Sequence, residues 1–170
     1  MRTSIPTRLL PALAAVLACA GVLSPAGAAG SVDVVFVEPA KFADAGRGEA
    51  EIARTVRALE AAFRSLASRL PDGQQLSVRV TQLDLAGELK PARAGAELRV
   101  LSGRADWPRM ELSYTLVQGG RTLKSGSARL ADMAYLQQPL GTREGEPYAY
   151  EQRMIERWFL DTIVPTRGSP

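Results

Sequence analysis

The chain has 170 residues, of which 46% are hydrophobic and 23% are charged, with no histidine and a single cysteine. This composition excludes a Ser-His-Asp triad, a Cys-His dyad, an intrachain disulfide and a zinc site built from histidines and cysteines. The formal charge of +3 includes two arginines of an amino-terminal leader. The remainder carries about +1, so we expect no nucleic-acid binding.

Residues 1–28 have the pattern of a secretory signal peptide. Arg2 and Arg8 precede an apolar run from Leu9 to Leu23, and Ala26-Gly27-Ala28 supplies a cleavage site before Ala29. The leader predicts a periplasmic or secreted protein.

A lipoprotein signal that ends at Cys19 is the alternative for this leader. We favour it less, because Leu17 is bulky where such signals use small residues and because the apolar run continues beyond the cysteine. No later stretch has the roughly 18 apolar residues that a membrane span requires. We therefore expect no transmembrane segment after cleavage.

The first half of the mature chain predicts a strand, a helix and a second strand. Residues 32–37 are apolar on both faces, which favours a strand inside a sheet. Residues 49–70 place apolar side chains at steps of three and four, as in an amphipathic helix. Residues 76–85 alternate as a strand does, but the phase slips near Thr81-Gln82, where we expect a β-bulge.

The second half predicts a hairpin and a final helix. Residues 88–103 contain Pro91 and Gly95, which favour a loop with at most one brief strand. Residues 110–130 alternate around Gly119-Gly120, so we expect a hairpin that places Leu116 opposite Leu123. A loop over 131–146 follows. Pro147 is then expected in the first turn of a helix with an apolar side that includes Tyr150.

This order of elements predicts a two-layer α+β fold. We expect an antiparallel or mixed sheet of four to five strands with two helices packed on one face, in a single domain over 29–170 with its core at about 32–164. Glu111, Ser113 and Thr115 would lie on the opposite, semi-polar face. That face is the natural place for a partner or ligand.

Four segments of the chain resemble a known family. They are the run Val32–Pro39, the block Thr81–Glu88, the string Asp106–Tyr114 that contains Trp-Pro-Arg, and the string Ala128–Tyr135. Together they resemble the domain-of-unknown-function family 3016 of exported proteins of Gram-negative bacteria, over about Val32 to Phe159. The resemblance implies a periplasmic location and one domain, with no activity or catalytic residue to transfer.

Four carboxylates are candidate functional groups. Asp84 and Glu88 flank a glycine, and Asp106 and Asp132 precede aromatic or methionine-containing strings. Brought together at one end of the sheet, they would supply an acid, a base or cation ligands. The simpler interpretation, which we favour, is that they cap turns and hydrogen-bond nearby backbone.

Three further side chains are candidates for a ligand or partner surface. Trp107 precedes Pro108, which favours an extended backbone. Its ring either contacts a ligand or packs in the core or at the sheet edge. Arg109 binds a carboxylate of a ligand or pairs with Asp106 or Glu111. Tyr135 lies near the last loop, and its role stays open.

Two functional hypotheses follow from these residues. We favour a non-catalytic binding or interaction module of the cell envelope, whose partner is an envelope protein or a cell-wall component, without a metal or organic cofactor. The alternative is a hydrolase or lyase that works with carboxylates.

Overall fold

The computed structural model describes residues 29–93 and 97–164. The strands are β1 (Ser31–Phe36), β2 (Gln74–Asp84), β3 (Glu88–Pro91), β4 (Glu97–Val100), β5 (Arg109–Gln118) and β6 (Arg121–Ala131). The α-helices are α1 (Gly48–Ser65) and α2 (Ala149–Thr162), and short 3-10 helices are η1 (Pro39–Lys41), η2 (Leu66–Arg69) and η4 (Gly141–Arg143). The predicted signal peptide, including Cys19 and the cleavage site, lies outside the described residues.

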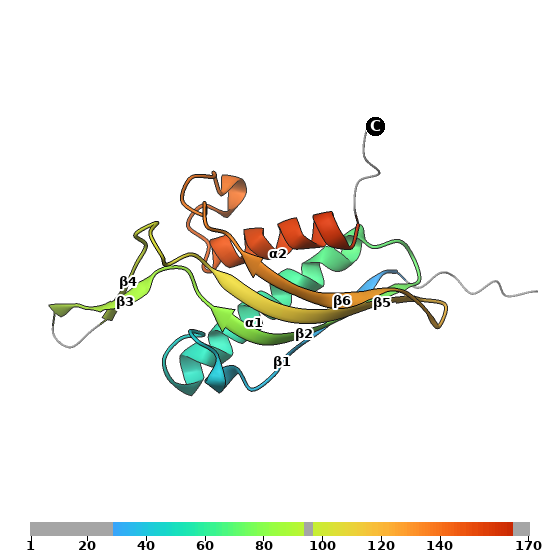
Figure 1. Ribbon diagram of the computed structural model, residues 1–170, viewed down its shortest axis with the longest axis horizontal. Helices are drawn as coiled ribbons and strands as arrows, with labels where there is room; N and C mark the ends of the chain where they lie inside the picture. Colours follow the sequence, from blue (N-terminus) through green and yellow to red (C-terminus); the bar gives the residue numbers. More distant parts are fainter. Residues whose placement is uncertain (1–28, 94–96, 165–170) are drawn as a thin grey trace, which may run out of the picture.

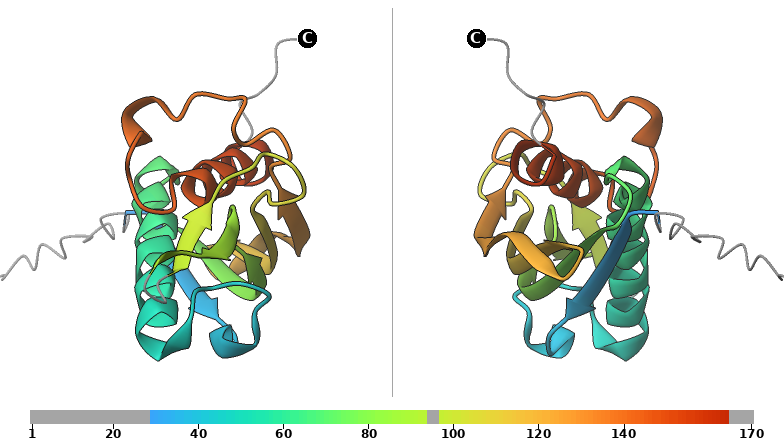
Figure 2. Two further views of the ribbon diagram at one scale, coloured as in Figure 1. Left: turned by 90° about the vertical axis from the view of Figure 1, so that its left-hand side faces the viewer. Right: turned by 90° about the vertical axis from the view of Figure 1, so that its right-hand side faces the viewer.

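A mixed four-stranded sheet forms one layer and the two α-helices form the other, which confirms the predicted α+β class (Figures 1 and 2). The strand order is β1-β2-β5-β6, with β1 parallel to β2 and the other neighbours antiparallel. β3 and β4 form a separate two-stranded hairpin. Within residues 29–93 and 97–164, no helix is both long and apolar enough to cross a membrane.

One hydrophobic core fills the space between the sheet and the helices. Alternate residues of β1, β2 and β5 are buried on the helix-facing side, and both helices add apolar side chains to the same cluster. The ring of Trp158 from α2 lies edge-on to Phe63 of α1 and to Tyr114 of β5, at centroid distances of 6.2 and 5.5 Å. Both helices therefore bury their apolar sides against the same face of the sheet.

Two sequence predictions about the first strand pairs have different outcomes. The bulge in β2 is confirmed: Val80 pairs with Leu112 and Gln82 with Glu111, which leaves Thr81 as the extra residue. The interior position predicted for residues 32–37 is wrong, because β1 is an edge strand. Its apolar residue on the uncovered side, Val35, is 54% exposed.

The β5–β6 hairpin has the predicted turn but a different register. Gly119 and Gly120 have φ of 56° and 77°, the positive values that a tight hairpin turn requires. A register shift after Val117↔Thr122 then pairs Leu116 with Lys124, not with Leu123. The bulge at Leu123 leaves that side chain 46% exposed.

The segment 88–103 was predicted as a loop with at most one strand, and this prediction is wrong. It forms the β3–β4 hairpin, which projects from the left-hand end of the molecule in Figure 1. The pairing Lys90↔Leu98 satisfies backbone groups that a solvated loop would leave to water.

The helix boundaries differ slightly from the sequence predictions. The first helix ends at Ser65, and η2 completes the predicted range to Arg69. The last helix begins at Ala149, because Tyr148 adopts a left-handed backbone at φ 59° before it, so Pro147 precedes the helix. Tyr150 is half-buried and packs edge-on to Tyr135 at 4.9 Å, instead of lying in the main core.

Candidate functional site

Two loops meet at the left-hand end of the large sheet in Figure 1, beside the base of the β3–β4 hairpin, and we call residues 101–108 and 132–147 the loop end. Asp106 in the first loop accepts hydrogen bonds from the backbone N–H groups of Ser102 and Arg104, at 2.6 and 2.9 Å. The hydroxyl of Tyr135 in the second loop donates to the same carboxylate at 3.0 Å. Asp106 therefore caps its own loop and joins it to the other.

This arrangement shifts the pKa values of both groups. Burial opposes ionisation of Asp106, but the hydrogen bonds from Ser102 and Tyr135 outweigh it and lower the pKa to about 2. Burial, with the neighbouring Asp106 carboxylate, raises the pKa of Tyr135 to about 12. A negatively charged Asp106 and a neutral Tyr135 are thus the stable forms of the pair.

Asp132 is buried in the same region and is paired with arginines of α2. Its carboxylate accepts a bond from Arg153 at 2.9 Å and lies 3.7 Å from Arg157. Arg153 also donates to the backbone oxygens of Tyr135 and Gln138, both at 2.6 Å. The ion pair therefore attaches the second loop to α2.

Asp84, Trp107 and Arg109 form a separate set of contacts. Asp84 and Arg109 are paired across β2 and β5, with 3.3 Å between side chains, and Arg109 stacks on the half-buried Trp107 at 4.7 Å. The sequence had suggested Asp106 or Glu111 as the partner of Arg109. The register corrects this, because it places Asp84 directly opposite Arg109.

The pKa of Asp84 is raised by burial, and Arg109 opposes that rise. Glu88 lies on the projecting β3 strand and is exposed, with Lys90 as its partner. Each of the four sequence-predicted carboxylates thus has its own cation or backbone donors. Among the described residues, no three His, Cys, Asp or Glu side chains come together in a way that could hold a metal ion.

Sequence reasoning missed a buried acid at the base of the hairpin. Glu151 of α2 is 2% exposed and accepts a hydrogen bond from the backbone N–H of Ala86 at 2.7 Å. Burial raises the pKa of Glu151, against the effect of the Ala86 bond. The sequence contained a signal for this burial. Glu151 precedes Met154 and Ile155 by three and four residues, which places it on the apolar side of the helix.

Arg99 was also missed, since its segment was predicted to be a loop. Its guanidinium pairs with Asp44 at 2.8 Å and donates to the backbone oxygens of Ala86 and Gly87 at 3.2 and 3.1 Å. These bonds fasten the β3–β4 hairpin to the end of the large sheet. Arg99 and Glu151 therefore both hold the backbone at Ala86, Arg99 through the Ala86 oxygen and Glu151 through the Ala86 N–H.

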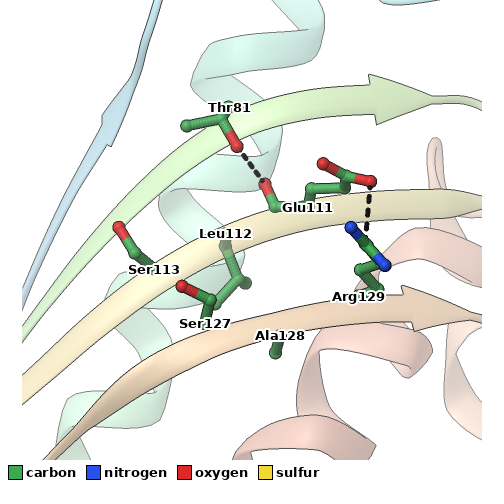
Figure 3. A pocket seen from close by; sticks show the side chains of 7 residues that line it. All are labelled: Thr81, Glu111, Leu112, Ser113, Ser127, Ala128 and Arg129. Carbon is green, nitrogen blue, oxygen red and sulfur yellow. Dashed lines mark hydrogen bonds and ion pairs between the residues drawn. The ribbon is translucent and has the colours of Figure 1, made fainter.

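Two of the concave surfaces formed by the described residues bear on the candidate site. One, of about 680 Å3, lies between the second loop and α2, and Leu101, Leu140 and Tyr150 are among its lining residues. The other, of about 450 Å3, is a shallow depression on the sheet face opposite the helices, which we call the open face (Figure 3).

The open-face depression crosses three strands. It is lined by Thr81 of β2, by Glu111, Leu112 and Ser113 of β5, and by Ser127, Ala128 and Arg129 of β6. Arg129 and Glu111 lie 3.3 Å apart, and the hydroxyl of Thr81 donates to the Glu111 backbone oxygen at 3.4 Å. Ser113 and Ser127 face each other across the strand pair and make no side-chain hydrogen bond to another described residue.

Comparison with known proteins identifies the family. The sequence model of the family described as "Protein of unknown function (DUF3016)" matches residues 30–161, so the chain belongs to this family. This confirms the resemblance inferred from the sequence strings. No curated protein and no solved structure matches the chain.

Proposed function

We propose that the protein is exported and acts as a non-catalytic binding module of the cell envelope, with the open face of its sheet as the binding surface. The leader over residues 1–28 supports export to the periplasm or the medium. A mature chain with almost no net charge and no histidine fits binding better than catalysis or nucleic-acid recognition.

The observation that supports binding most directly is the difference between the two sheet faces. The helices bury one face over β1, β2 and β5, whereas the other face has a hydroxyl-rich depression whose Ser113 and Ser127 make no side-chain hydrogen bond within the described residues. Side chains that stabilise nothing in the monomer are free to bind a partner without a cost to the fold.

The carboxylate-dependent hydrolase or lyase has less support. In glycosidases, such chemistry uses two carboxylates in one pocket, about 5 to 10 Å apart, with room for a substrate between them. Asp106 instead caps a loop, and Asp132 pairs with Arg153. Glu151 has a raised pKa, but its carboxylate holds the Ala86 backbone.

A photo-crosslinking experiment in the native envelope tests the proposed surface. A photoreactive residue at Ser127 is compared with the same residue at Arg57, an exposed position on α1. We expect a discrete adduct from position 127 that a Ser113→Arg change in the same chain removes, and none from position 57. Equal labelling at both positions, or no adduct at 127, would contradict the proposal.

Intact-mass measurement of the protein purified from the envelope tests export separately. We expect a chain that begins near Ala29 without a lipid. A diacylglyceryl mass on Cys19 would show that the lipoprotein alternative is correct, and a chain that retains Met1 would contradict export.

Thermal melting with added calcium or magnesium tests whether the module works without a metal. Since the carboxylates already have cation or backbone partners, we expect an unchanged midpoint. A rise of several degrees that EDTA reverses would indicate a metal site, because a ligand that binds only the folded state stabilises it.

A further inference from the structure

Among the described residues, the outer edge of β6 is a row of backbone groups that pair with no other strand. In the strand order β1-β2-β5-β6, β6 pairs with β5 on one side, and no described strand pairs with its other side (Figure 1). Every residue from Arg121 to Ser127 is exposed. Such an edge offers alternating N–H and C=O groups to any extended chain that lies alongside it.

The carboxyl-terminal part of β6 is suited to pairing. From Ser125 to Ala131 the register with β5 runs without a shift, whereas the bulge at Leu123 interrupts the earlier part. The small residues Ser125, Gly126, Ser127 and Ala128 keep this stretch unobstructed. Gly126 has a packing reason to be small, since a Cβ there would lie 3.2 Å from the Tyr114 hydroxyl oxygen.

The charges of β6 all have one sign. Arg121, Lys124 and Arg129 are its charged residues, and it contains no acid. The opposite edge of the sheet differs, because Asp33 is the charged residue of β1. Arg129 is paired with Glu111, but its side chain is 88% exposed and accessible to a second carboxylate.

These charges argue against a second copy of the chain as the occupant. Two β6 strands paired antiparallel would bring Arg121 and Lys124 of one copy toward Arg129 of the other, and like charges across a strand pair are destabilising. An acidic chain in the same place would meet complementary charge at Arg121 and Arg129, whereas the Lys124 ammonium already donates to the Thr162 backbone oxygen of α2.

We propose that the edge of β6 binds an extended, acidic polypeptide segment of a partner protein as a fifth strand. This inference rests on the proposed binding function and specifies the chemistry of the partner. Side chains of a strand alternate between faces, so the added strand presents one set beside Arg129 on the open face. The other set meets the groove of about 230 Å3 between β6 and α2, where Leu130, Met154 and Trp158 provide apolar surface.

A defined peptide tests this arrangement. The probe is acetyl-Glu-Val-Glu-Val-Asp-Val-Glu-amide, with acids for one face and valines for the other. Binding to the mature protein is measured from backbone amide shifts in NMR titrations. We expect the largest shifts at Ser125–Ala131, and about tenfold weaker binding of the same peptide with lysine in place of each acid.

Backbone methylation separates strand pairing from simple charge attraction. One version of the acidic peptide is N-methylated at its valines and another at its acidic residues. An added strand points alternate N–H groups at its neighbour, so we expect one version to lose binding and the other to retain it. Equal binding of both versions would overturn strand addition.

Charge reversal locates the site. Arg121→Glu with Arg129→Glu is compared with Arg54→Glu and Arg57→Glu on α1, which changes the net charge equally. We expect binding of the acidic peptide to weaken about tenfold in the β6 variant and less than about twofold in the control, with melting confirming that both are folded. Equal weakening in the two variants would overturn the assignment to β6.

The inference and the proposed function fail in different ways. If a partner crosslinks at position 127 but the acidic peptide does not bind β6, strand addition is wrong and the binding function stands. If position 127 gives no adduct while the peptide binds at α1 or not at all, both are wrong.

Discussion

The loop end and the open face both contain polar residues, but in opposite situations. At the loop end, Asp106 and Asp132 are buried and bonded to donors from distant parts of the chain. On the open face, Ser113 and Ser127 lie side by side without a side-chain bond to a described residue. Polar residues at the loop end stabilise the fold, and those on the open face are available to a partner.

This difference changes how candidate site residues should be chosen. Of the carboxylates that stood out in the sequence, Asp106 and Asp132 are buried and bonded within the protein, and Asp84 and Glu88 are paired with cations nearer the surface. The surface that remains available is the semi-polar sheet face that strand alternation had predicted, and its individual residues do not differ in kind from those of an ordinary solvated strand.

The largest effect is expected at the buried ion pair. Asp132→Ala should lower the free energy of unfolding by about 3 kcal/mol, because it leaves the charge of the largely buried Arg153 side chain unbalanced. Denaturant unfolding measures the loss. The matched control is Glu111→Ala, which removes an exposed acid that pairs with Arg129. A loss below about 0.5 kcal/mol for Asp132→Ala would mean that the loop end does not depend on this pair.

A smaller effect, with a defined pH dependence, is expected at Asp106. Its pKa of about 2 in the folded protein lies below the ordinary 3.8, so the unfolded chain binds the proton first as pH falls. Its contribution to stability is complete above pH 3.8 and disappears as pH drops toward about 2. Asp106→Asn should cost about 2 kcal/mol at neutral pH through its lost hydrogen bonds to a charged group, and should flatten the acid limb of the stability curve.

Glu151 should show the opposite pH dependence of stability, because its pKa is raised and not lowered. Burial raises its pKa, so its contribution is complete below the ordinary 4.5 and is lost as pH rises through the folded value. Glu151→Gln should therefore remove the part of the stability loss that the wild type shows as pH rises above 4.5. Identical pH profiles for the wild type and both variants would contradict the assigned protonation states.

A third, smaller effect is expected at the turn between β5 and β6. Gly120→Val should cost about 1 kcal/mol, because valine is strained at φ 77° even though a Cβ there meets no atom within 4 Å. Thermal melting measures the change. Arg121→Val, one residue later, is the control for an added β-branched side chain. A wild-type midpoint for Gly120→Val would show that the turn tolerates a different backbone.

The smallest effect is expected on the open face. Ser127→Ala should change the free energy of unfolding by less than about 0.5 kcal/mol, since the hydroxyl bonds to no described side chain. Denaturant unfolding checks this value, and peptide titration of the same variant checks binding. A loss of more than about 1 kcal/mol would mean that the open face stabilises the fold as the loop end does.

Local patterns in the sequence predicted much of the fold, because periodicity and turn chemistry depend on neighbouring residues. The stripe of α1, the phase slip at Thr81 and the Gly119-Gly120 turn were all correctly identified, and so was the α+β class. The strings around Trp107 and Asp132 also led to the correct family.

Only the tertiary structure decided the position of β1, the register of the hairpin and the role of each acid. β1 was assigned to the interior because its own pattern is apolar, but an edge position depends on which strand lies beside it. Leu123 was displaced by a bulge that no local rule requires. Asp132 depends on Arg153 and Asp106 on Tyr135, partners that are separated by 21 and 29 residues and meet only when the chain is folded. Side-chain chemistry is local in the sequence, but burial and pairing are properties of the folded chain, so the sequence alone could nominate these acids but could not assign their roles.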